Sequence, residues 1–251
     1  MSSSELNIQN LKVSFHTPKG KLTAVNGISF NLNQGETLAL VGESGCGKTV
    51  TALSILRLLP EPPAEISSGK ILFSGHNLLS LNAKALQDLR GRSISMIFQD
   101  PMTSLNPVLT IGEQMAEILL RHTTMNRQEA LQKSVDLLNR VELPSAKEKL
   151  SHYSHQLSGG MRQRVMIAMA LACAPRVLIA DEPTTALDVL IQAQILELLE
   201  NLKKEHGMSI LIITHDLGVV AEIAQRVMVM YAGEIVESGP ARALLDNPLH
   251  P

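Results

Sequence analysis

Hydrophobic residues recur at every second position in two stretches near the start of the chain. Apolar side chains alternate with polar ones over 11–15 and again over 28–32, on either side of a turn at 16–20 that contains Pro18 and Gly20. A period of two is typical of a strand with one buried face, and proline and glycine favour the turn between two such strands. The pattern therefore predicts an antiparallel β-hairpin.

Short apolar runs alternate with stretches of helical periodicity through much of the remaining chain. Pro60 is expected to stop a helix that begins near Lys48, and Gly207 to end a later one. Repeated alternation of strand and helix favours a mostly parallel sheet with helices on both faces. The predicted strands cover 38–41, 71–73, 177–180, 209–214, 226–231 and 234–238, and the predicted helices cover 48–59, 161–174 and 191–206.

The segment from about 91 to 155 shows helical periodicity without intervening strands. Apolar positions three or four residues apart predict one helix that includes 111–119 and a second that includes 131–138. Asn126 and Glu129 have the spacing of an N-cap residue and its N3 partner at the start of the second helix. We therefore expect a helical insert within the α/β pattern.

Composition limits the classes of protein that the chain can represent. Apolar residues make up 45% of its 251 residues and aromatic residues only 2%, so the expected core is aliphatic. The net charge is −2 and the pI is about 6.4, so the whole chain shows no basic footprint for nucleic acid. Cys46 and Cys173 form neither a disulfide framework nor a metal cluster, which fits a reducing cytosol.

No stretch of the chain has the pattern of a membrane span. The longest uninterrupted apolar run, Val165–Ala174, is far shorter than the roughly 18 residues that suggest one. The first ten residues are polar and carry no signal-peptide pattern. Any work at a membrane is therefore expected to depend on partner chains.

A glycine-rich loop between a predicted strand and a predicted helix matches the P-loop pattern. Glycines let successive backbone N–H groups turn toward phosphate oxygens, and the helix N-terminus adds a favourable partial charge. Lys48 is expected to reach the β- and γ-phosphates and the Thr49 hydroxyl to bind Mg²⁺. Cys46 is expected to fill space in the loop rather than to serve a redox role. The residues are Gly42, Glu43, Ser44, Gly45, Cys46, Gly47, Lys48 and Thr49.

Two carboxylates, Asp181 and Glu182, follow the apolar run 177–180 directly. Asp181 can hold Mg²⁺ directly or through water, and Glu182 can polarise an attacking water as a general base. An acidic pair that caps a helix is the alternative interpretation. The P-loop favours the catalytic one, because phosphate chemistry needs a metal ligand and a base.

Ser158, Gly159 and Gly160 precede the predicted helix 161–174. Exposed N–H groups, a hydroxyl and the helix dipole make such a start a candidate second anion site. Spacing alone leaves an ordinary helix cap equally open. One P-loop and one second phosphate site in a chain suggest a dimer in which each ATP lies between two copies.

The ordered set of motifs resembles the ABC ATPases. Ser158–Gly160, about 20 residues before Asp181, is similar to the family signature. The resemblance implies that Phe15 stacks on adenine, although a plain core aromatic remains an alternative. It also implies that Gln99 contacts Mg²⁺ and water and that His215 contacts the γ-phosphate. Residues 185–188 resemble the D-loop.

The resemblance implies three sets of site residues. The catalytic residues are expected to be Glu182, His215, Gln99 and Lys48, and the metal ligands Thr49, Gln99 and Asp181. Arg162 and Arg164 are expected on a solvated helix face near the dimer interface, and Met161, Met166 and Met169 in the core. Expected nucleotide contacts are Phe15, Gly42, Glu43, Ser44, Gly45, Cys46, Gly47, Lys48, Thr49, Val50, Ser158, Gly159, Gly160 and Asp188.

The implied fold is α/β, with a RecA-like P-loop NTPase core, an N-terminal antiparallel β element and an inserted α-helical subdomain. We expect the core in 1–90 and 159–251 and the helical subdomain in 91–158, with the glutamine loop and the signature assigned to the latter. Residues 98–107, 158–170 and 247–251 resemble in particular the oligopeptide, dipeptide and nickel importer ATPases. Many of these continue into a cysteine-containing region that can hold an iron–sulfur cluster. This chain ends at Pro251, so no cluster is assigned to it.

The resemblance implies an importer motor that uses ATP and Mg²⁺. Its expected partners are a second ATPase subunit, identical or a sister, two transmembrane permeases and, indirectly, an extracytoplasmic binding protein, with no nucleic acid. The expected location is peripheral, at the cytoplasmic face of the inner membrane. The segment after Gln99 is expected to pass motion to the permeases. Peptides are the expected cargo, and nickel or another metal chelate is the alternative.

Two other classes of P-loop protein are alternatives to the importer. A soluble ABC ATPase that acts on DNA or ribosomes usually carries two cassettes or a very long coiled-coil insert, and this chain shows neither. A P-loop kinase for small molecules would leave Ser158–Gly160 and His215 without an obvious role. The importer ATPase therefore explains more of the motifs than either alternative.

Overall fold

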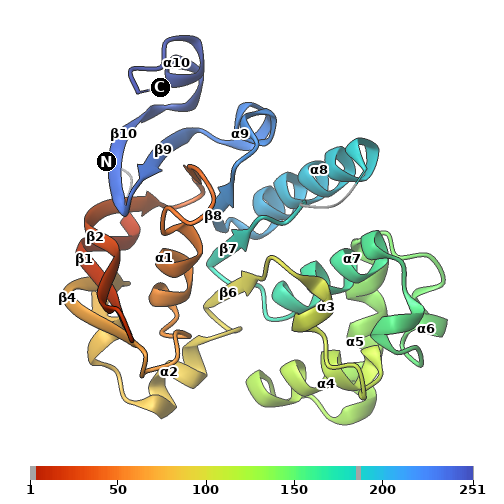
Figure 1. Ribbon diagram of the computed structural model, residues 1–251. Coiled ribbons are helices and arrows are strands. Elements are labelled where there is room, and N and C mark those ends of the chain that lie inside the picture. Colours follow the sequence, from red (N-terminus) through yellow and green to blue (C-terminus); the bar gives the residue numbers. More distant parts are fainter. Residues whose placement is uncertain (1–3, 185–187, 251) are drawn as a thin grey trace. The chain divides into compact units, whose positions relative to one another are not determined.

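The computed structural model describes residues 4–184 and 188–250, and most of its elements are labelled in Figure 1. The chain forms two compact units, which we call the first unit and the central unit. The first unit comprises residues 1–87 and 207–251, and the central unit comprises residues 88–206. Residues 159–206 therefore belong to the same compact unit as the helical segment. The expected nucleotide-binding core, 1–90 with 159–251, divides the chain by function instead and stays a prediction.

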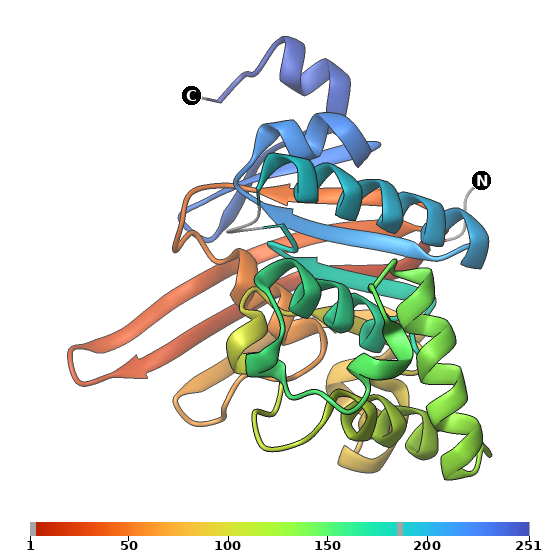
Figure 2. The same cartoon turned by 90° about the vertical axis from the view of Figure 1, so that its right-hand side faces the viewer.

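An antiparallel sheet in the order β2-β1-β4-β5 belongs to the first unit. Its strands are β1 (Ser4–Thr17), β2 (Gly20–Asn33), β4 (Ala64–Phe73) and β5 (His76–Asn77). Figure 2 shows β1 and β2 as one long hairpin, and they pair antiparallel as predicted. β1 begins at Ser4, earlier than the alternation indicated. Leu6 and Ile8, which lie in this additional N-terminal part of the strand, are fully buried.

Parallel strands of the same unit carry the glycine loop. β3 (Thr37–Val41) pairs in parallel with β8 (Ser209–Thr214) on one side and β9 (Arg226–Tyr231) on the other, and β10 (Glu234–Pro240) pairs antiparallel with β9. All five residues of β3 and all six of β8 are buried, as expected for strands covered on both faces. The helices of this unit are α1 (Lys48–Ile55), η1 (Leu78–Ser80), α2 (Ala83–Leu89, which crosses the boundary), α9 (Leu217–Ile223) and α10 (Ala241–Asp246).

In the central unit, two parallel strands are joined by a mainly helical segment. The strands are β6 (Ile94–Ile97) and β7 (Val177–Asp181). The helices are α3 (Pro101–Ser104), α4 (Ile111–His122), α5 (Arg127–Arg140), α6 (Ala146–Lys149), η2 (Ser154–Gln156), α7 (Gly159–Ala170) and α8 (Val189–His206). Asn126 and Glu129 form the predicted capping box of α5, and an equivalent box at Thr110 and Glu113 begins α4. Within the described ranges, no helix has both the length and the apolar character that a membrane span requires.

Three predictions about this architecture were wrong. β6 lies inside the segment interpreted as purely helical, because four buried residues are too few to show a period. α1 ends at Ile55 rather than near Leu59, since Arg57 adopts a left-handed conformation (φ 50°). α7 ends at Ala170 rather than at Ala174, which also has a positive φ (50°), so the apolar run continues through a turn in which Leu171 and Ala172 are buried and Ala174 is exposed.

The expectation of a solvated arginine face on α7 was also wrong. Arg164 is only 9% exposed, and its guanidinium donates to the carbonyl of Val141 (2.6 Å) and to Gln194 Oε1 (2.9 Å). Arg162 is half-buried and donates from Nε to the carbonyl of Ser154 (2.9 Å). Both side chains therefore connect elements of the central unit.

Candidate active site

The glycine loop lies between the end of β3 and the start of α1, as the pattern predicted. Gly42 (φ 156°) and Gly47 (φ 112°) have backbone conformations that side chains rarely adopt. A Cβ atom on Gly42 would collide with the carbonyl oxygen of Met230, and one on Gly47 with that of Ala24. Glycine is thus required at both positions for steric as well as conformational reasons.

Lys48 is 6% exposed, and its ammonium closes the loop onto itself. Nζ donates to the carbonyl oxygens of Gly42 (2.7 Å) and Glu43 (2.9 Å), so the charge is held over the loop. Thr49 is half-buried in the first turn of α1, while Ser44 and Gly45 are exposed. Backbone N–H groups, a helix N-terminus and a fixed ammonium form an anion cradle.

His215 lies at the same edge of the sheet as the loop. β3 and β8 are parallel with Val41 opposite Thr214, so Gly42 and His215 leave the sheet at the same level. His215 is exposed, and a cavity of about 370 Å³ in the first unit is lined by Gly42, Glu43 and His215 together with apolar residues of β9 and α10. The tertiary fold therefore brings His215 to the loop across more than 160 residues of sequence.

Phe15 stands near the other side of the loop. It is half-buried and pairs with Leu22 across the hairpin. The carbonyl of Ala24, two residues after Leu22 on β2, lies against Gly47. Two residues of a strand span roughly 7 Å, so Phe15 is offset by about that length along the hairpin from the contact with the loop. This position suits an aromatic contact to the base of a bound nucleotide.

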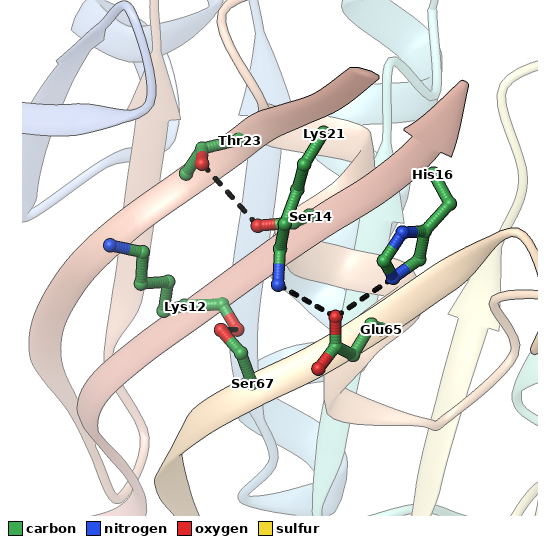
Figure 3. A network of polar contacts seen from close by, with 7 residues as sticks. All are labelled: Lys12, Ser14, His16, Lys21, Thr23, Glu65 and Ser67. Carbon is green, nitrogen blue, oxygen red and sulfur yellow. Dashed lines mark hydrogen bonds and ion pairs between the residues drawn. The ribbon is translucent and has the colours of Figure 1, made fainter. Parts of the chain in front are cut away.

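A polar cluster occupies the hairpin beside Phe15 (Figure 3). Glu65 of β4 accepts from Lys21 Nζ (2.7 Å) and lies 3.0 Å from His16 Nε2, and Ser14 and Thr23 join β1 to β2 through their hydroxyls (3.3 Å). The hydrogen bond from Lys21, followed by that from His16, lowers the pKa of Glu65. The charged groups are accessible to water whereas Ser14 is buried, so each ion pair contributes little alone, but together the contacts join three strands beside Phe15.

The carboxylates of the central unit lie at the end of β7. Asp181, the last residue of the strand, is 1% exposed, and Glu182 follows with φ 47°. Gln99 comes shortly after β6, the parallel neighbour of β7, and its Nε2 donates to Glu182 Oε2 (3.1 Å). The structure thus brings together three residues that the sequence placed in the site.

Ser158 is the N-cap of α7, and its Oγ accepts from the backbone N–H of Met161 (3.3 Å). A Cβ on Gly159 would meet nothing within 4 Å, whereas a Cβ on Gly160 would lie 3.4 Å from the side chain of Ile191 of α8. Ser158 and Gly159 are exposed, so this helix start is accessible to an anion. Asp188 is exposed just before α8, and the remainder of the predicted D-loop, residues 185–187, lies outside the described residues.

The expected metal ligands are a hydroxyl (Thr49), a carboxylate (Asp181) and an amide oxygen (Gln99). An all-oxygen donor set fits Mg²⁺, which usually retains water and phosphate oxygens and uses few protein ligands. Among residues 4–184 and 188–250, no group of three or more His, Cys, Asp or Glu could hold a metal ion. The donors present therefore fit a nucleotide-bound Mg²⁺ rather than a protein-only cage.

Sequence reasoning overlooked Gln163, a buried residue of α7 whose side-chain amide donates to the carbonyl of Pro183, directly after Glu182. The one signal available was a glutamine two residues before the apolar run that starts at Val165. A polar residue at the edge of such a run does not reveal which distant carbonyl it meets.

Comparison with known proteins places these features in a family. Residues 25–185 match the family model described as ABC transporter. The dipeptide transport ATP-binding protein DppD of Bacillus subtilis (strain 168) is 54% identical over 246 residues, or 98% of this chain and 73% of DppD. The oligopeptide transport ATP-binding protein OppD of the same strain is 52% identical, over 98% of this chain and 69% of OppD.

Solved structures lead to the same family. The dimeric post-hydrolysis structure of the ATP-binding cassette MJ0796, bound to ADP and Pi, is 28% identical, with a TM-score of 0.85 over 94% of this chain and 99% of that one. The RecA-like cassette fold expected from the motifs is thereby confirmed. The chain belongs to the ABC transporter family and is an ATPase of that family.

Proposed function

We propose that this ATPase powers a peptide importer and that it acts as a dimer around two Mg-ATP. The main support for ATP binding is the glycine loop. Backbone contacts exclude any Cβ at Gly42 and Gly47, and the buried Lys48 is held by carbonyl oxygens of the loop. Similar proteins are named for dipeptide and oligopeptide transport, and another, 53% identical, for glutathione import. These names favour peptides over nickel or another metal chelate as the cargo.

On the phosphate side, the N–H groups of Gly42 to Val50 and Lys48 bind the β- and γ-phosphates. Phe15 stacks on adenine, and His215 senses the γ-phosphate from the end of β8. Thr49, Gln99 and Asp181 hold Mg²⁺, which when bound neutralises charge that develops on the phosphates. Glu182 orients and polarises the attacking water, and its hydrogen bond from Gln99 fixes the carboxylate direction.

Dimerisation follows from the exposed start of α7. Ser158 and Gly159 are exposed at this helix N-terminus, and we assign them, with Gly160 and Asp188, to the nucleotide held by a partner copy. A cassette of similar structure is dimeric in its ADP- and Pi-bound state. The partner of this chain is either a second copy or a sister ATPase.

The exposed apolar side chains after β6 provide a surface for the permeases. Phe98, Met102 and Val108 are 38%, 56% and 76% exposed within one short segment of the central unit. Exposed apolar clusters commonly mark protein interfaces. Through this contact the subunit would sit peripherally at the cytoplasmic face of the membrane, where two permeases carry the cargo delivered by an extracytoplasmic binding protein.

The substitution Glu182→Gln tests the catalytic part of the proposal. Removing the base should lower the steady-state rate of ATP hydrolysis by about 10²- to 10⁴-fold. ATP binding should persist, and the variant should elute as a dimer on sizing with Mg-ATP. Glu117→Gln, which changes an exposed carboxylate of α4, is the matched control. A Glu182→Gln protein that hydrolyses ATP at the wild-type rate would contradict the assignment.

The cargo is tested separately in vesicles that contain the permeases and the binding protein. ATP-dependent uptake of a labelled dipeptide should be competed by unlabelled peptides and not by a nickel chelate. Alanine substitution of Met102 and Val108 should lower uptake and permease-stimulated hydrolysis, while hydrolysis by the isolated subunit stays unchanged. If this variant kept wild-type uptake and wild-type permease-stimulated hydrolysis, the assignment of Met102 and Val108 to the permease contact would be refuted.

A further inference from the structure

The backbone of Glu182 is in a conformation that few side chains adopt. Its φ of 47° lies in the left-handed region, which is strained for a residue other than glycine. Such a conformation persists only when the surrounding structure determines it from both sides. The carboxylate assigned as the base therefore depends on whatever holds the residues before and after it.

The side before Glu182 is held by β7. All five residues of that strand are buried, and it pairs in register with β6, with Ile97 opposite Ala180. Because Gln99 follows β6 by two residues, the same pairing brings its amide to the Glu182 carboxylate. The strand and its neighbour thus fix where the turn at Glu182 begins.

The side after Glu182 is held by Gln163. This residue is 2% exposed, and its Nε2 donates to the carbonyl oxygen of Pro183. Pro183 has no N–H group and is itself buried, so its carbonyl is the polar backbone group through which a neighbour can hold it. A buried amide with a buried carbonyl partner is costly to break, because both groups would lose their hydrogen bond away from water.

Gln163 belongs to the helix that begins with Ser158. Further contacts connect α7 to α8, the helix that follows the Glu182 turn. Ile191 packs on Gly160, and Arg164 donates to Gln194. The element after the turn is thus attached to the same helix as Pro183.

We propose that Gln163 is a positioning residue for ATP hydrolysis, which acts through the Pro183 carbonyl to hold Glu182 in its left-handed conformation. It joins the phosphate-binding start of α7 to the base, one helical turn away from Ser158–Gly160. The inference rests on the proposed role of Glu182. It predicts that loss of the Gln163 amide displaces the base without disturbing the groups that bind ATP.

The test uses Gln163→Met, which keeps side-chain volume and removes the donor. Since displacements of about 1 Å can cost 10²-fold in rate, we expect kcat for ATP to fall roughly 10- to 100-fold. KM should stay within about twofold, because the interaction matters in the transition state rather than in binding. The matched control is Gln114→Met. Gln114 is also a buried glutamine of the central unit that donates to loop carbonyls (Asn106 and Leu109), and its loss should leave the kcat of the isolated subunit unchanged.

A double variant separates positioning from general damage to the fold. If Gln163 acts only through Glu182, adding Gln163→Met to Glu182→Gln should change the residual hydrolysis rate little, and the ATP-bound dimer should still form. The proposal would be overturned if Gln163→Met lowered the hydrolysis rate by the same factor in the wild-type and in the Glu182→Gln protein. It would also be overturned if Gln163→Met alone left kcat unchanged. Should Gln163→Met fail to fold, Gln163→Asn keeps a polar amide but shortens the side chain by one methylene, which withdraws the donor from the Pro183 carbonyl, and the same kcat loss is expected.

The outcome also separates this inference from the proposed function. Full activity of Glu182→Gln would refute the assignment of Glu182 as the base and, with it, the proposed mechanism. An inactive Glu182→Gln protein together with a fully active Gln163→Met protein would remove only the role of Gln163.

Discussion

The two units hold their reactive groups by different means. In the first unit, the phosphate cradle is made of backbone: Gly42 and Gly47 adopt conformations and close approaches that exclude a side chain, and Lys48 is fixed by carbonyls of its own loop. In the central unit, Glu182 also has a positive φ but carries a side chain, and it is held by Gln99 and, through Pro183, by Gln163. Lys48 is thus held within its own loop, and Ala24 and Met230 restrict the cradle through their backbone alone, whereas the base depends on side chains distant in sequence.

This difference predicts which kind of substitution impairs each unit. A cradle formed by backbone groups tolerates changes of side chain elsewhere but no Cβ at its contact points. A base held by long-range hydrogen bonds tolerates small local changes but depends on buried polar side chains of other helices. Each of the three substitutions below tests one side of that contrast.

The largest effect is expected from Gly47→Ala. The added Cβ would meet the Ala24 carbonyl and φ would remain at 112°, so the loop must move and ATP affinity should fall at least about 100-fold. Gly35→Ala is the control, since Gly35 also has a positive φ (71°) but no atom lies within 4 Å of its Cβ position. It should lower stability by about 1 kcal/mol and leave ATP affinity intact. Fluorescent nucleotide titration measures both, and equal affinity losses would show that backbone strain alone matters.

Next in size is the effect of Arg164→Ala on the central unit. The change leaves the Val141 carbonyl and Gln194 without the guanidinium and opens a cavity, so unfolding should become easier by about 2–4 kcal/mol. Arg127→Ala, at an exposed position of α5, should stay within about 0.5 kcal/mol of wild type. Urea denaturation followed by circular dichroism gives the comparison. A wild-type midpoint for Arg164→Ala would show that its buried contacts contribute nothing to stability.

The smallest expected effect is the pH dependence contributed by His122. Burial, followed by repulsion from Arg121 and Arg92, lowers the pKa of this histidine in the folded chain. The unfolded chain then binds more protons just below the ordinary pKa of 6.5, so stability falls as pH drops from neutral through that value toward the folded pKa. His122→Gln should flatten this part of the stability curve, measured as urea midpoints between about pH 7.5 and pH 5. Gln128→Asn, an exposed substitution on α5 that changes no titratable group, should retain the wild-type slope.

Local patterns in the sequence were sufficient for most of the fold. The hairpins at 11–32 and 226–240, the capping box of α5 and the glycine loop were all predicted, because each depends on residues close together in the chain. The family resemblance was confirmed as well, since the order of motifs is itself a property of the sequence. The individual roles of the site residues stay predictions until the variants are measured.

Tertiary structure alone decided the features that depend on distant partners. β6 is a strand because it pairs with β7 some 80 residues later, and Arg164 is buried because Val141 and Gln194 offer acceptors at the right distance. The register of β3 and β8 brings His215 to the loop, and the left-handed turn at Glu182 with its support from Gln163 had no local signature. A sequence specifies backbone preferences within a few residues, while the partners that satisfy buried polar groups are chosen only when the chain has packed.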